Sequence, residues 1–167
     1  MKRVYGLEMR LPEGKTPGFY AQIVKGIAER TVLYDRHKEL LIFGDSSGLP
    51  NVLELLAHYK VEAEPVDLLC APSENVRGTD RFDDFAFVSR EGRAYFDLAY
   101  AAAFRLNEQR PEAETAPALM QLEEHLLAEI VEGDTRWQVI ERQLADLAER
   151  VARAYHCGVE WWNPDRL

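Results

Sequence analysis

The fold is decided by residues 1–71, MKRVYGLEMRLPEGKTPGFYAQIVKGIAERTVLYDRHKELLIFGDSSGLPNVLELLAHYKVEAEPVDLLCA. Apolar and polar residues alternate over residues 4–11, which is the period-two pattern of a strand with one buried face. A helix follows, because Pro17 suits a first helical turn and apolar residues recur every four positions. Its expected buried residues are Phe19, Ile23 and Ile27. The chain therefore begins as a strand and a helix.

The rest of this stretch predicts a hairpin, a second helix and a last strand. The β-prone runs 31–34 and 40–43 surround the polar residues 35–38, as in a hairpin. Pro50 opens a helix with a regularly spaced apolar stripe, and a strand follows within residues 61–71. The order strand, helix, strand, strand, helix, strand is the ferredoxin-like βαββαβ arrangement with an antiparallel sheet. We therefore expect an α+β fold.

Beyond residue 71 the pattern predicts a mainly helical extension over residues 82–167. After a turn-rich loop and a further strand or hairpin around Phe85 and Phe87, the alanine-rich residues 95–107 predict a helix. Two further helices are expected to form a C-terminal helical hairpin, separated by Gly133 and Asp134 as caps. Their apolar positions are Leu119, Leu122, Leu126 and Ile130 in the first helix, and Trp137, Ile140, Leu144, Leu147, Val151 and Ala154 in the second.

Length and composition predict one globular domain over residues 1–167. A chain of 167 residues and 19.2 kDa with 47% apolar residues can bury one core and is too short for two ordinary domains. Glu8 and Arg10 interrupt any signal-peptide core, and no apolar run is long enough to span a bilayer. We therefore expect a cytoplasmic protein without membrane contact, in which Cys70 and Cys157 are reduced.

The charge distribution predicts a basic protein partner. The net charge is −9, and residues 108–134 contain eight acidic residues against one arginine. A field of this sign repels nucleic acid and attracts cationic surfaces. If residues 117–130 are helical, their carboxylates form an acidic helical face. The expected partner-binding residues are Glu123, Glu124, Glu129 and Glu132, with Trp161 and Trp162 as aromatic contacts.

These features favour a protein-binding module over an enzyme. Immunity proteins, antitoxins and other acidic inhibitors combine a negative field with aromatic contacts to bind basic partners quickly. The interpretation left open for Trp161 and Trp162 is that their rings dock on the protein's own core. Another alternative is a structural subunit that forms a homodimer through the apolar seam from Trp137 to Ala154.

One short segment resembles the first block of the GDSL, or SGNH, hydrolases. Residues 41–46, LIFGDS, match the strand and turn that carry the serine nucleophile in that family. The resemblance implies a small hydrolase that uses the turn at 44–46, with Ser46 as its nucleophile. The family's D-x-x-H and G-x-N-D segments have no counterpart in this sequence, so a base and oxyanion donors are missing.

No motif assigns a cofactor, a metal site or catalytic residues. His125 and Glu129 are spaced for one helical face, but no H-E-x-x-H or E-x-x-H motif joins them. The adjacent residues His156 and Cys157 would point about 100° apart on a helix, which is unfavourable for thiol chemistry. We therefore expect no cofactor, no metal and no catalytic site.

Overall fold

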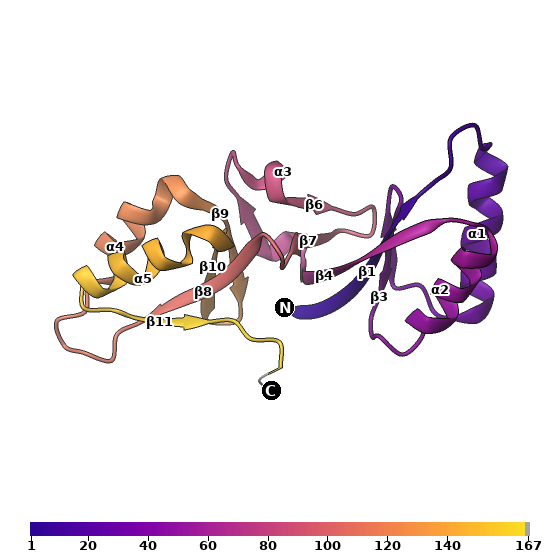
Figure 1. Ribbon diagram of the computed structural model, residues 1–167. Helices are drawn as coiled ribbons and strands as arrows, with labels where there is room; N and C mark the ends of the chain where they lie inside the picture. Colours follow the sequence, from indigo (N-terminus) through magenta and orange to yellow (C-terminus); the bar gives the residue numbers. More distant parts are fainter. Residues whose placement is uncertain (166–167) are drawn as a thin grey trace. The chain divides into compact units, whose positions relative to one another are not determined.

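The computed structural model describes residues 1–165 and has a mixed α+β fold with antiparallel sheets (Figure 1). The chain divides into two compact units. We call them the N-terminal unit, Arg3–Leu68 with Ser89–Glu91, and the C-terminal unit, which comprises Met1–Lys2, Leu69–Val88 and the chain from Gly92 onward. None of the helices in residues 1–165 combines the length and apolar composition needed to cross a bilayer.

The N-terminal unit is a sheet with two helices on one face (Figure 1). Its elements are β1 (Lys2–Arg10), α1 (Pro17–Arg30), β2 (Asp35–His37), β3 (Leu40–Phe43), α2 (Leu49–His58) and the first part of β4 (Glu62–Pro72). The strand order is β2-β3-β1-β4, and β3 is antiparallel to both β1 and β2. The expected order of strands and helices over residues 1–71 is confirmed.

Local sequence explains why these elements form where they do. Thr16 caps α1 by accepting a hydrogen bond from the Phe19 amide at 3.4 Å, and Pro17 occupies the first turn. Ile23 and Ile27 are fully buried against Leu7 and other residues of β1 and β3, as the spacing predicted. Burial of this apolar stripe holds α1 on the sheet.

The position predicted for the first hairpin strand is wrong. Strand β2 consists of residues 35–37, which the sequence pattern assigned to the turn, and residues 31–34 are not a strand. His37 pairs with Leu40, so the turn is the dipeptide Lys38-Glu39, with Lys38 at a φ of 53°. A two-residue turn with positive φ matches the twist of paired strands, and this geometry overrides the weak β propensity of the polar residues.

The C-terminal unit contains the remaining strands of the described chain and three α-helices. They are the end of β4, β5 (Val76–Gly78), α3 (Phe82–Phe85), β6 (Ala86–Val88), β7 (Arg93–Asp97), β8 (Ala101–Asn107), α4 (Thr115–Leu122), β9 (Leu126–Glu132), β10 (Thr135–Glu141), α5 (Ala145–Ala154) and β11 (Gly158–Trp161). Five of the strands form a sheet in the order β11-β8-β10-β9-β5. Strands β6 and β7 form a short hairpin, which is one of the two alternatives expected around Phe85 and Phe87.

The five-stranded sheet of the C-terminal unit separates two apolar cores. On one face, Trp137 and Val139 of β10 pack with Leu69 of β4 and Phe96 of β7. On the other face, α4 and α5 cover Phe104 and Ile140. Ala148 and Ala152 of α5 are fully buried there, which lets the helix approach the strands closely.

The predicted C-terminal helical hairpin is wrong, because its central part is a β-hairpin. Only α4 and α5 remain helical, and residues 126–132 and 135–141 pair as β9 and β10. The turn between them is Gly133-Asp134, with Gly133 at a φ of 58°, so these residues turn a hairpin instead of capping helices. Leucine at three- and four-residue intervals suits a helix. Ile130, Trp137 and Val139 are instead buried together in an apolar core as parts of a sheet, and this burial outweighs the helical spacing.

The predicted helix over residues 95–107 is also wrong. This segment forms β7, a turn held by the Ala99 amide, which donates to the Asp97 carboxylate at 2.8 Å, and strand β8. Ala101, Ala102 and Ala103 are buried in β8, between neighbours β10 and β11. Alanine's preference for helix is a fraction of a kcal/mol per residue, so strand pairing and burial outweigh it. The extension over residues 82–167 therefore has more residues in strands than in α-helices, and it is not the mainly helical segment that the sequence predicted.

Candidate functional site

The expected acidic helical face does not exist, because its four glutamates lie in different elements. Glu123 and Glu124 belong to a short 3-10 turn, Glu123–His125, and both are exposed. Glu129 and Glu132 lie in β9, where an odd separation places their side chains on opposite faces. The premise of one helix presenting four carboxylates is therefore corrected.

Two of these glutamates are paired within the protein. Arg136 forms an ion pair with Glu129 at 3.2 Å, and Gln138 donates a hydrogen bond to its other oxygen at 3.1 Å. Arg77 lies 3.8 Å from the same carboxylate, across the β5–β9 pair. The Met1 amino group forms an ion pair with Glu132. Glu129 and Glu132 therefore hold strands and the N-terminus together.

The exposed Glu123 and Glu124 lie beside a second group of carboxylates, on α3 and in the residues just before it. The Thr79 hydroxyl donates to the Leu126 carbonyl at 2.8 Å, and Arg81 donates to the His125 carbonyl at 3.5 Å. These bonds place the start of α3 against the start of β9. We call the resulting surface the acidic corner. It consists of Asp80, Asp83, Asp84, Glu123 and Glu124, all of them exposed.

The charges of the acidic corner are largely uncompensated. Within residues 1–165, no lysine or arginine forms an ion pair with any of its five carboxylates. The one nearby imidazole among these residues is that of His125, whose Nε2 atom lies 3.4 Å from the Glu124 carboxylate. Arg81 lies among them, but its guanidinium forms an ion pair with the buried Glu141. The corner therefore keeps a negative surface field.

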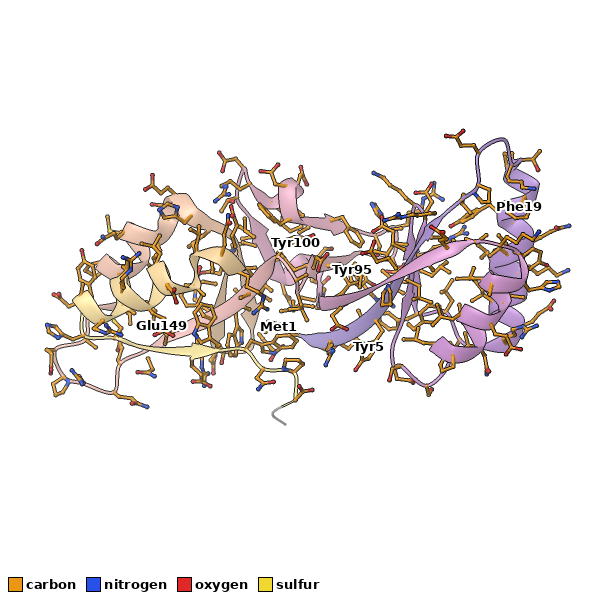
Figure 2. The ribbon with its side chains drawn as sticks, in the orientation of Figure 1. Met1, Tyr5, Phe19, Tyr95, Tyr100 and Glu149 are labelled. Carbon is orange, nitrogen blue, oxygen red and sulfur yellow. The ribbon has the colours of Figure 1, made fainter. Side chains whose placement is uncertain are left out.

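Trp161 and Trp162 are both half-buried on the protein's own cores. The Trp161 indole donates to Glu149 at 2.7 Å, and its ring packs against Phe104 with the centroids 5.3 Å apart. Figure 2 shows Glu149 on α5, facing β11. The Trp162 amide donates to the Ala103 carbonyl at 2.8 Å, and its side chain packs on the apolar core that contains Trp137 and Phe96. The structure therefore shows the alternative left open by the sequence, in which the rings of Trp161 and Trp162 dock on the protein's own cores.

The turn that resembles the GDSL block contains no assembled nucleophile. Asp45 accepts a hydrogen bond from the Ser47 hydroxyl and a second from the Ser47 amide at 2.9 Å. These bonds lower the pKa of Asp45. The Ser46 hydroxyl makes no hydrogen bond with any residue in the range 1–165. A serine needs an adjacent base to act as a nucleophile. The geometry gives Ser46 none.

The apolar seam expected to form a homodimer is internal. Trp137 and Ile140 lie in β10 and are buried in opposite cores, whereas Leu147 and Val151 lie in α5. These residues do not share one helix, so they present no continuous stripe to a second copy.

A pocket of about 280 Å³ lies at the C-terminal end of α5. It is bounded by the end of β8, the loop after it, the last turns of α5 and the start of β11. The residues around it are Asn107, Gln109, Arg110, Glu149, Arg153, His156, Cys157, Gly158 and Val159. The Glu114 amide donates to the Tyr155 carbonyl at 2.9 Å, which ties the loop after β8 to the end of α5.

The thiol in this pocket is not poised for nucleophilic chemistry. Cys157 is 9% exposed, and its thiol donates to the Tyr155 carbonyl at 3.5 Å. Burial, with a smaller contribution from the Glu108 and Glu114 carboxylates, raises the pKa of Cys157. The thiol is therefore protonated at neutral pH, and it supplies an apolar part of the wall. Among residues 1–165, no three His, Cys, Asp or Glu side chains are grouped as ligands for a metal.

Sequence reasoning did not bring together the residues of the pocket or of the acidic corner. Arg110 and Arg153 are separated by the whole β9–β10 hairpin, and no spacing motif connects them. The only local signal for the corner was the pair Asp83-Asp84. Comparison with known protein families found none that matches the chain, and comparison with curated proteins found no significant relative.

Proposed function

We propose that this chain is a non-enzymatic intracellular protein-binding module that docks a basic partner on the acidic corner. The N-terminal unit is, in this proposal, a ferredoxin-like scaffold, which its strand order β2-β3-β1-β4 supports. The partner is a protein with a cationic surface, such as a toxin or nuclease that an immunity protein or antitoxin would neutralise.

The observation that carries the proposal is the set of uncompensated carboxylates on rigid elements. Asp83 and Asp84 lie on α3, and Glu123 and Glu124 lie on the turn before β9. Hydrogen bonds from Thr79 and Arg81 fix these two elements against each other. A fixed group of like charges steers an oppositely charged partner and raises its association rate by about 10- to 1,000-fold.

The proposed surface differs from the one expected from the sequence. It keeps Glu123 and Glu124 and adds the aspartates of α3. It leaves out Glu129 and Glu132, whose charges are paired internally. It also leaves out Trp161 and Trp162, because their rings already pack on the protein's own cores.

The test is the association rate with a partner isolated from the native cell. A partner captured at low salt is identified and purified, and its binding to the full chain is followed by stopped-flow at several salt concentrations. The test variant carries Asp83→Lys, Asp84→Lys, Glu123→Lys and Glu124→Lys. The matched control reverses four exposed glutamates of the N-terminal unit, Glu13, Glu29, Glu54 and Glu62.

We expect the corner variant to associate at least about tenfold more slowly and with a flatter salt dependence. The control variant has the same net charge, so it separates a local surface effect from a general one. Equal rates for the two variants would show that the acidic corner is not the docking surface.

A further inference from the structure

The pocket at the end of α5 has a surplus of positive charge in a protein whose net charge is −9. Arg110 and Arg153 both border it, and neither forms an ion pair with any residue of the described chain 1–165. The carboxylate in its wall, Glu149, already accepts the Trp161 indole hydrogen at 2.7 Å. Two guanidinium groups are therefore available to a ligand.

A second pocket shows why the unpaired arginines matter. It has a volume of about 320 Å³ and is bordered by Arg105 and Arg136. Arg105 makes two hydrogen bonds of 2.9 Å to Glu160, and Arg136 pairs with Glu129 at 3.2 Å. Its arginines already have carboxylate partners, whereas those of the first pocket have none.

The floor of the first pocket is shaped by Asn107 and Gly158, which pair across β8 and β11. A Cβ atom at Gly158 would lie 2.4 Å from the Asn107 Oδ1 atom, so only glycine leaves room for the amide in this position. Asn107 Oδ1 is buried and makes no hydrogen bond with any described residue. A buried acceptor without a partner costs free energy.

We propose that this pocket binds a small organic monocarboxylate, with Arg110 and Arg153 pairing the carboxylate. Guanidinium groups match the planar carboxylate geometry, and Cys157 and Val159 offer apolar wall to a compact organic group. With Glu149 in the wall, the two arginines leave a surplus of one positive charge. That surplus matches a ligand with one negative charge, and a ligand with two, such as a phosphate monoester, exceeds it.

The test is an NMR titration of the uniformly labelled full chain with three matched probes. Phenylacetate is the monocarboxylate, phenylacetamide is its neutral counterpart, and phenyl phosphate is the dianion. Phenylacetate is expected to shift the amide signals of residues 107–110 and 156–159, with a dissociation constant in the millimolar range or tighter. Phenylacetamide is expected to bind at least about tenfold more weakly, because it lacks the charge that pairs with arginine.

Two variants separate the pocket from general charge effects. Arg110→Gln with Arg153→Gln is expected to weaken phenylacetate binding at least about tenfold. Arg150→Gln removes the same type of charge from an exposed position on α5 outside the pocket, and it is expected to leave binding within about twofold.

Three results would overturn the proposal. The first is the lack of shifts around the pocket at about 20 mM phenylacetate, a concentration at which even a weak small-ligand site fills. The second is phenylacetate binding by the double arginine variant that is as tight as binding by the unaltered protein. The third is tighter binding of phenyl phosphate than of phenylacetate, which would assign the pocket to phosphate.

Discussion

The guanidinium of Arg81 forms an ion pair with the carboxylate of Glu141, 60 residues further along the chain. The Glu141 side chain is 7% exposed, and its second oxygen accepts a hydrogen bond from Gln143. Arg81 also donates to the His125 carbonyl at 3.5 Å. One arginine thus connects the start of α3 with β10 and with the turn before β9, beneath the acidic corner.

Removal of the Arg81 charge should destabilise the protein, because it leaves a carboxylate buried without its partner. We expect Arg81→Met to lower the free energy of unfolding by about 2–3 kcal/mol in urea denaturation. Arg77→Met is the matched control, since the Arg77 side chain is 74% exposed and 3.8 Å from its carboxylate. Its cost should stay below about 1 kcal/mol. Similar costs for the two variants would contradict a buried Arg81–Glu141 pair.

The close approach of Asn107 to Gly158 predicts a specific pair of substitution effects. Gly158→Ala should destabilise the protein by about 1–3 kcal/mol, because the new methyl group overlaps the Asn107 amide. Asn107→Ala combined with Gly158→Ala should recover most of that loss, because the overlapping atoms are gone. A double-mutant cycle measured by thermal or urea unfolding gives the coupling. Additive effects would mean that the two side chains do not compete for space.

The C-terminal turns of α2 and α5 share an unusual feature. His156 and Lys60 follow the helix caps at φ values of 60° and 57°, with backbone hydrogen bonds such as Cys157 N to Ala152 O at 2.9 Å. This is the Schellman motif, in which glycine is preferred. We therefore expect His156→Gly and Lys60→Gly each to raise the free energy of unfolding by about 1 kcal/mol. A loss of stability in both variants would exclude the left-handed conformation.

In the turn before α2, Ser47 and Ser46 are expected to differ in their effect on the pKa of Asp45. Ser47 donates to Asp45 and lowers the pKa of that carboxyl, so the bonds stabilise the charged form. Their stabilising effect is present above the unfolded-state pKa and is lost as the pH falls through the lower folded-state pKa. Ser47→Ala should raise the pKa of Asp45 toward its ordinary value, measured by carbon NMR of the carboxyl group. Ser46→Ala should leave the titration unchanged.

The prediction of one cooperative domain has a direct optical test. All three tryptophans, Trp137, Trp161 and Trp162, belong to the C-terminal unit, whereas α1 belongs to the N-terminal unit. Because β4 contributes to both units, we expect urea unfolding followed by tryptophan fluorescence and by far-ultraviolet circular dichroism to give coincident transitions. Separate midpoints would show that the two units unfold independently.

The accuracy of sequence-based prediction differs sharply between the two ends of the chain. In β1 and α1, short-range periodicity and the Thr16–Pro17 cap agree with each other, so the local sequence specifies each element. In residues 126–141, leucine spacing suggests a helix while Ile130, Val139 and the Gly133-Asp134 turn favour strands. That conflict is resolved only by pairing with β8 and β5, which come from distant parts of the sequence.

The candidate sites were even less predictable than the fold. A carboxylate's effect depends on what lies within a few ångströms, and Glu129 is neutralised by Arg77 and Arg136 from neighbouring strands. The negative charge of Glu123 remains uncompensated, because no lysine or arginine of the described chain forms an ion pair with it. Composition gave the sign of the regional charge, but it gave no information on which carboxylates are paired.

Local periodicity and the counts of charged residues were enough to predict the α+β class, the order of elements in residues 1–71 and the acidic character. Tertiary structure alone decided that residues 95–107 and 126–141 are strands, since nonlocal pairing and burial outweigh differences in helix propensity of less than about 1 kcal/mol per residue. It also decided which charges remain available for binding, because ion pairs join residues that are far apart in the chain.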